Sequence, residues 1–133
     1  MQKFKTTIPL EKKAILKADG KNIPCKSVCF HSGNITSKVT ICSSLSEIPN
    51  FDKIQSPIIV FNPYCEQISR QIFFLNAPAI AIKYRDVNKV LVAKRIEGKV
   101  VIEPTTYTAR NILVGNTKNP KNICFAHYDS WYY

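Results

Sequence analysis

The sequence predicts a mostly β member of the α+β class, on three observations. Short apolar runs are separated by frequent turn signals, and several runs alternate apolar with polar residues, as half-buried strands do. Among the apolar segments, residues 65–76 best match the i, i+4, i+7 spacing of an amphipathic helix. The chain has 133 residues, of which 45% are hydrophobic, which is enough for a compact core. We therefore expect about nine strands and one helix.

Two dipeptides predict tight hairpins. Asp19-Gly20 separates residues 13–17 from residues 23–30, and both turn positions tolerate a positive φ. Glu97-Gly98 separates two further extended segments, residues 89–96 and 99–103, and predicts a second hairpin.

Two continuous apolar runs predict strands that are buried on both faces. Residues 58–61 (IIVF) lie between Pro57 and Pro63, and residues 79–84 (AIAIKY) follow Pro78, which ends the expected helix. Runs of this kind are typical of the inner strands of a covered sheet.

The charge balance constrains the partners. Nineteen basic and nine acidic residues give a net charge of +10, which favours acidic partners. The basic residues are spread along the chain, no cluster is denser than Lys12-Lys13 or Lys94-Arg95, and no aromatic-interleaved RNA-binding motif accompanies them. We therefore expect a solvated basic surface rather than a nucleic-acid interface. No secretory signal and no apolar stretch of about 20 residues is present, which predicts a cytoplasmic protein without membrane contact.

Five cysteines leave at least one thiol unpaired in a monomer. Cys25, Cys29 and His31 have a C-x3-C-x-H spacing, but in a strand the two cysteines would lie about 13 Å apart, too far to share a metal ion. We expect core thiols, which behave as small hydrophobic groups. The sequence leaves open a disulfide between Cys29 and Cys42 or between Cys25 and Cys65.

The carboxyl-terminal segment carries the candidate chemistry. Residues 123–126 (ICFA) predict a short buried strand that delivers His127 and Asp129 at its end. A metal-binding imidazole needs a carboxylate or carbonyl on its second nitrogen, and His-x-Asp supplies both groups if the chain bends suitably. The alternative is a surface turn. Residues 131–133 (WYY) either line a substrate pocket or form an exposed apolar surface that self-associates.

This segment resembles a known family. Residues 111–115 (NILVG) and 122–130 (NICFAHYDS) resemble the start of the catalytic domain in the zinc aminopeptidases of the M28 family, which includes aminopeptidase Y and the transferrin-receptor-like proteins. Residues 58–60 and 76–82 look like the protease-associated (PA) domain of such enzymes, with proline where the family usually has glycine. The resemblance covers roughly residues 45–133.

The resemblance implies a division of the chain and a role for two residues. Residues 1–104 would form a PA-like accessory lid, a β-barrel or sandwich with one or two helices. Residues 105–133 would form the first strands of a truncated α/β zinc-peptidase domain. In the family, the residue that matches His127 binds one of two zinc ions. The catalytic aspartate that matches Asp129 holds that imidazole. The implied activity is hydrolysis of peptides at their amino terminus.

The residues present predict an incomplete active site. A dizinc site needs about six protein ligands and a general base, and only Asp129 lies near His127 in sequence. We therefore expect the chain alone to bind no zinc tightly and to hydrolyse no peptide. Two alternatives come from other classes: a non-catalytic PA-like domain that binds proteins, and a small basic β domain that binds nucleic acid.

Overall fold

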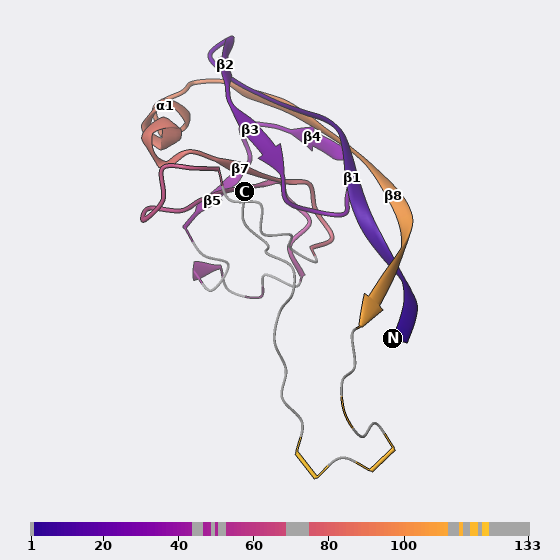
Figure 1. The fold of residues 1–133 in the computed structure, drawn as a ribbon. Helices are drawn as coiled ribbons and strands as arrows, with labels where there is room; N and C mark the ends of the chain where they lie inside the picture. Colours follow the sequence, from indigo (N-terminus) through magenta and orange to yellow (C-terminus); the bar gives the residue numbers. More distant parts are fainter. Residues whose placement is uncertain are drawn as a thin grey trace.

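The computed structural model describes residues 2–43, 47–48, 50, 53–68, 75–111, 115, 118–119 and 121–122. The mostly β, α+β class is confirmed: these residues contain eight strands, one short α-helix and a 3-10 turn (Figure 1). In chain order the elements are β1 (Gln2–Ala18), β2 (Lys21–Ile23), β3 (Cys25–Ser27), β4 (Gly33–Ile35), β5 (Thr40–Cys42), β6 (Ile58–Phe61), β7 (Ala79–Ile82), η3 (Tyr84–Asp86), α1 (Val87–Leu91) and β8 (Ile96–Asn111).

The first sheet is antiparallel, with the strand order β2-β1-β8-β4. β1 and β2 form the hairpin that Asp19-Gly20 predicts. Ala18 pairs with Lys21, so the loop has two residues, and both have a positive φ, 48° at Asp19 and 79° at Gly20. This geometry matches the right-handed twist of the flanking strands.

The predicted hairpin across Glu97-Gly98 is wrong. Val87–Leu91 forms the helix α1, and β8 runs without interruption from Ile96 to Asn111, with Gly98 inside it. Gly98 pairs with Leu16 on β1 and with Ile35 on β4. Gly98 therefore does not form a turn. It allows β1 and β4 to approach β8 closely. β8 also continues through residues 104 and 105, where the sequence places a domain boundary, and that boundary stays a prediction.

The second sheet is mixed, with the strand order β3-β7-β6-β5. β6 is parallel to both β5 and β7, whereas β3 pairs antiparallel with β7. The strand predicted over residues 58–61 is confirmed as β6, which is buried at its first three residues. The strand predicted over residues 79–84 is confirmed for Ala79–Ile82, which are buried throughout, but Tyr84 begins η3 and is 52% exposed. Of the helix predicted over residues 65–76, residues 65–68 and 75–76 lie in bends and loop and are not helical, and residues 69–74 lie outside the described residues.

A single hydrophobic core joins the two sheets. Leu16 and Val100 from the first sheet, and Ile58, Ile80 and Ile82 from the second, are each at most 1% exposed and belong to one cluster of buried residues. Among the described residues, no helix is long and apolar enough to cross a membrane. The cytoplasmic location stays a prediction.

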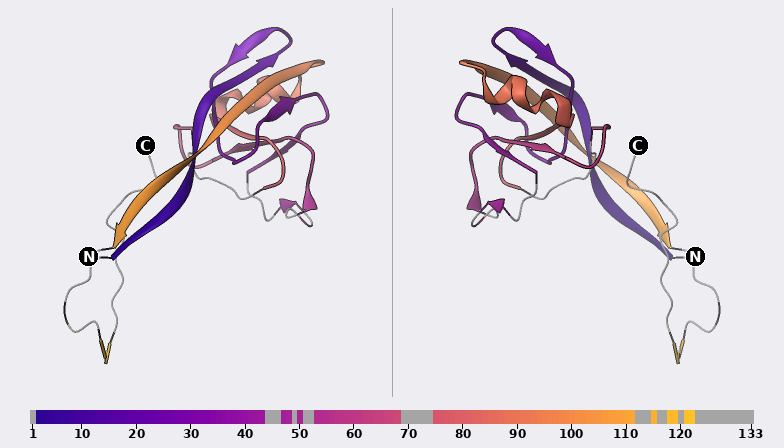
Figure 2. Two further views of the ribbon diagram at one scale, coloured as in Figure 1. Left: turned by 90° about the vertical axis from the view of Figure 1, so that its right-hand side faces the viewer. Right: turned by 90° about the vertical axis from the view of Figure 1, so that its left-hand side faces the viewer.

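β1 and β8 extend well beyond this core. Their register pairs Gln2 with Asn111 at one end and Ala18 with Ile96 at the other. Figure 2 shows that the end with Gln2 and Asn111 projects away from the other strands as a two-stranded ribbon. We call this paired segment, Gln2–Glu11 of β1 with Ile102–Asn111 of β8, the ribbon.

Candidate functional site

The residues predicted for zinc lie outside the described residues. This applies to His127, to Asp129 and to the strand expected over residues 123–126. In the part of the chain that the structure describes, no group of three His, Cys, Asp or Glu side chains comes together as a metal site would require. The described residues by themselves therefore do not form a zinc site.

Cys29 is a core thiol, as predicted. It is 1% exposed, its Sγ donates to the carbonyl of His31 at 3.2 Å, and it accepts from the Ala79 N–H at 3.1 Å. Burial raises the pKa of this thiol, partly offset by its backbone hydrogen bonds. The His31 side chain is exposed, so Cys29 acts as a packing group and not as a ligand.

Cys25 is half-buried and protonated at neutral pH. Burial, followed by the charge of Glu11, raises the pKa of its thiol from 9.0 to about 11, against an opposing effect of Lys26. Cys25, Cys29, Cys42 and Cys65 are all free thiols, so neither of the two disulfides that the sequence left open is formed. Burial raises the pKa of the Cys25, Cys29 and Cys42 thiols, so none of these three is an activated nucleophile, because a reactive thiol needs a lowered pKa.

β1 carries a β-bulge where the ribbon leaves the sheets. Glu11 pairs with Ile102, but Lys13 pairs with Val101, so Lys12 is an extra residue in β1. An inserted residue moves the side chains that follow it to the other face relative to the partner strand. Ile15 occupies an odd-numbered position and is 37% exposed. Phe4, Ile8 and Leu10 before the bulge and Leu16 and Ala18 after it all occupy even-numbered positions, so the bulge divides them between the two faces.

Past the bulge these residues enter the core, and Leu16 is 1% exposed. Before the bulge they lie on the opposite face. Phe4, Ile8 and Leu10 are 43%, 42% and 43% exposed, and Tyr107, which pairs with Thr6 on the same face, is 55% exposed. We call Phe4, Ile8, Leu10 and Tyr107 the ribbon face. By the same pairing Thr6, Thr105 and Glu103 also lie on this face. Several exposed apolar side chains on one face mark an interaction site more often than a single exposed side chain does.

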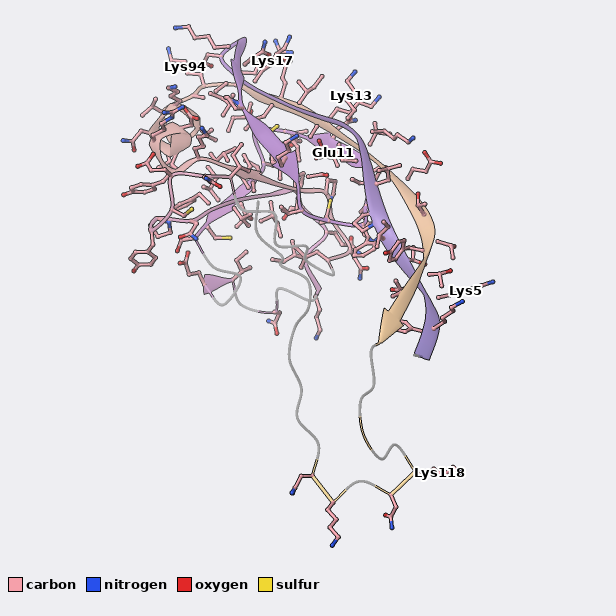
Figure 3. All side chains as sticks on the ribbon, in the orientation of Figure 1. Lys5, Glu11, Lys13, Lys17, Lys94 and Lys118 are labelled. Carbon is pink, nitrogen blue, oxygen red and sulfur yellow. The ribbon has the colours of Figure 1, made fainter. Side chains whose placement is uncertain are left out.

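The other side of the ribbon is polar and basic. Lys3, Lys5 and Thr7 alternate with the ribbon face and are exposed, as Figure 3 illustrates for Lys5. Among the described residues neither lysine has an ion-pair partner, whereas Lys12 at the bulge pairs with Glu103 at 2.9 Å. The ribbon is therefore amphipathic, with one apolar and one cationic side.

Glu11 ties the bulge to the second sheet. Its carboxylate accepts from both the N–H and the hydroxyl of Ser27 on β3, each at 2.6 Å, and lies 3.9 Å from the Lys26 ammonium. Hydrogen bonds to a charged acceptor are stronger than those between neutral groups. This contact, labelled at Glu11 in Figure 3, fixes the direction in which the ribbon leaves the core.

The sequence reasoning missed the ribbon face and Glu11. A signal was present, since the polar run Glu11-Lys12-Lys13 separates two apolar segments of the strand, residues 8–10 and 14–16. The sequence alone does not distinguish a regular strand from one with a bulge at this run. The pairing of Glu11 with Ile102 and of Lys13 with Val101 shows that the bulge is present.

Comparison with known proteins gives a structural likeness only. No protein-family model and no curated protein sequence matches the chain. Among solved structures it is similar to an aminopeptidase from Aneurinibacillus sp. strain AM-1, with 12% identity, a TM-score of 0.48, and coverage of 81% of this chain and 35% of that one. It is also similar to a zinc aminopeptidase from Bacillus subtilis, with 8% identity, a TM-score of 0.49, and coverage of 84% and 38%. The chain spans little more than a third of the length of these two proteins.

Proposed function

We propose that this chain is the accessory domain of a metal-dependent aminopeptidase, and that its ribbon face packs against the catalytic part of the enzyme. The observation that carries the proposal is the change of face at Lys12, which turns the apolar residues of β1 away from their own core. A strand that buries one apolar half and exposes the other is built to contact a second body. Residues 122–130 resemble the start of the catalytic domain of the zinc aminopeptidases, so we take that catalytic domain to be the second body.

In this proposal the two sheets form a lid that restricts which peptides reach the active site. The ribbon is the stem of the lid, and the bond between Glu11 and Ser27 sets its angle. His127 would bind one of two zinc ions, and Asp129 would hold its imidazole. The substrate would be a peptide with a free amino terminus. The zinc ligands would come from residues other than those that the structure describes.

The experiment uses the polypeptide that the gene encodes, in its natural length. Hydrolysis of leucine p-nitroanilide and of a leucyl tripeptide is measured with and without a chelator. We expect hydrolysis that the chelator abolishes. In Ile8→Glu the KM for the tripeptide should rise by about tenfold, because a carboxylate on the ribbon face loses its hydration when the face is covered.

Thr7→Glu is the matched control, since it places the same charge one residue away on the other side of the ribbon. It should leave KM within about twofold of the wild type. Equal effects of the two variants would contradict the docking role. Absence of chelator-sensitive hydrolysis would instead assign the chain to the alternative, a non-catalytic PA-like domain that binds proteins.

A further inference from the structure

Three strands of the second sheet are parallel and end at one edge. β6 lies between β5 and β7, and the three strands end at Cys42, Phe61 and Ile82. The loops that follow parallel strands meet at such an edge, where ligands often bind. We call the ends of these strands and the residues that follow them the carboxyl edge; it comprises residues 42–43, 47, 61–68 and 82–86.

Two aromatic rings stack at the carboxyl edge. Phe61 ends β6 and is paired in register with Ile82, and Tyr84 begins η3 two residues later. The centroids of the Phe61 and Tyr84 rings lie 5.7 Å apart, with 22° between the ring planes. This is the offset arrangement that aromatic pairs prefer, so Phe61 helps to hold the Tyr84 ring in position.

Two tyrosines at this edge are open to solvent. Tyr84 is 52% exposed although Phe61 stacks on it, and Tyr64, three residues after Phe61, is 96% exposed. Asn62 orders the loop that carries Tyr64, because its Oδ1 accepts from the Tyr64 N–H at 2.9 Å and its carbonyl accepts from the Cys65 N–H at 3.4 Å. An exposed aromatic ring is a surface on which a flat ligand stacks, and a ring that is already held in place costs less to order.

Two cations flank Tyr84. Lys83 precedes it and is half-buried, and Arg85 follows it and is exposed. Among the described residues neither cation has an ion-pair partner. Unpaired cations beside an exposed aromatic ring suit a ligand that combines a flat ring with a negative charge.

The acidic groups described at the carboxyl edge are neutralised or follow other strands. Asp86 is 2% exposed, and its carboxylate lies 2.6 Å from the Lys89 ammonium. Glu47 follows β5 and Glu66 lies in the loop after β6, whereas both cations follow β7. We therefore expect an anionic ligand on the side of β7.

These features favour single-stranded nucleic acid over other partners. The bases of a single strand are free to stack on a protein side chain, whereas a duplex keeps the faces of its bases covered. A proline-rich peptide also packs on exposed aromatic rings, but it gains nothing from the two cations. The net charge of +10 attracts a polyanion to the chain as a whole.

We propose that the carboxyl edge binds single-stranded nucleic acid. One base stacks on the exposed side of the Tyr84 ring, and the adjacent phosphates contact Lys83 and Arg85. A neighbouring base stacks on Tyr64. The sequence predicts no nucleic-acid interface, because Phe61 and Tyr84 come together only in the fold. This inference does not depend on the proposed function, because it uses neither the ribbon face nor the zinc residues.

The test is a titration of the full chain with fluorescein-labelled oligothymidylate of about twelve nucleotides, followed by fluorescence anisotropy. At low salt we expect saturable binding with a Kd of about 10 μM, which weakens as the salt concentration rises. An oligomer of the same length without bases carries the same phosphates and should bind at least about fivefold more weakly, because it cannot stack. This comparison uses the wild type, so it does not depend on the folding of a variant.

Tyr84→Leu keeps an apolar contact with Phe61 but removes the ring, and it should weaken binding at least about fivefold. Tyr84→Phe keeps the ring and should bind within about twofold of the wild type. Arg85→Ala should reduce the slope of log K against log salt concentration by about 0.7, the contribution of one phosphate contact in a single strand. Lys5→Ala removes the same charge on the ribbon and should leave the slope unchanged (Figure 3).

The proposal is overturned if oligothymidylate does not bind at low salt, if the oligomer without bases binds as tightly, or if Tyr84→Leu binds like the wild type. It is also overturned if Arg85→Ala and Lys5→Ala change the slope equally. A polyproline peptide that binds more tightly than oligothymidylate would overturn it in favour of a proline-rich partner.

Discussion

Replacing Gly98 by alanine tests the packing of the first sheet. A Cβ at this position would lie 2.5 Å from the carbonyl oxygen of Ile15 and 3.0 Å from the Cβ of Ile35. The nearer contact is with backbone, so β8 must move away from β1. Overpacking of this kind costs about 1–3 kcal/mol. Alanine also restricts the unfolded chain, which returns about 0.4–1 kcal/mol.

At the middle of these two ranges the net loss for Gly98→Ala is about 1.3 kcal/mol, which lowers the Tm of a chain of this length by about 5 °C. Thermal unfolding followed by circular dichroism measures this change, and hydrogen exchange locates it. Protection should fall in β4, which pairs with β8 at Gly98.

Gly20→Ala is the comparison. Its Cβ would meet nothing within 4 Å, but its φ is 79°, so its cost of about 1 kcal/mol is local backbone strain. It should leave the protection of β4 unchanged. A Gly98→Ala protein that unfolds at or above the wild-type temperature, with β4 still protected, would refute the packing described for the two sides of β8.

Three further predictions follow from the structure. Glu11→Ala should lower the free energy of unfolding by about 1–3 kcal/mol, because Ser27 loses the acceptor of two hydrogen bonds. Urea titration measures this loss. As the comparison, Glu103→Ala breaks the exposed ion pair with Lys12 and should lower the free energy of unfolding by at most about 1 kcal/mol. The raised pKa of Cys25 keeps the folded state protonated where the unfolded state has lost its proton, so stability should fall as the pH rises from 9.0 toward about 11. Cys25→Ala should flatten that slope, and an unchanged slope would contradict the assignment. Finally, the 133 residues alone should release no p-nitroaniline from leucine p-nitroanilide when zinc is added, and turnover that a chelator abolishes would show that expectation to be wrong.

The sequence predicts those elements whose signals are local. The turn at Asp19-Gly20 depends only on which residues tolerate a positive φ, and the structure has it. The buried runs in β6 and β7 are continuous apolar segments between prolines or turns, and their burial follows from composition alone.

Where the sequence prediction fails, long-range contacts decide. Glu97-Gly98 has the composition of a turn, but Gly98 is required because Ile15 and Ile35, from two other strands, approach it. The helix α1 has only five residues, with Val87 and Val90 buried, which is too short for a periodic pattern to appear.

The same reason explains the candidate sites. Phe4 and Leu16 are an even number of residues apart, which in a regular strand would place them on the same face. Only the pairing of β1 with β8 shows that the bulge at Lys12 puts them on different faces. The Asp19 carboxylate likewise accepts from the backbone N–H of Arg95, which lies 76 residues further along the chain. No local pattern brings these groups together.

The proposal that this chain is part of a zinc aminopeptidase is tested most directly by zinc K-edge X-ray absorption on the natural-length gene product. We predict a scattering shell from imidazole nitrogen at about 2.0–2.1 Å, which weakens in His127→Ala and persists in His31→Ala, the chain's other histidine. A zinc spectrum that is the same in the wild type and in His127→Ala would contradict the assignment of His127 as a zinc ligand, and with it the proposed place of this chain in a metal-dependent peptidase.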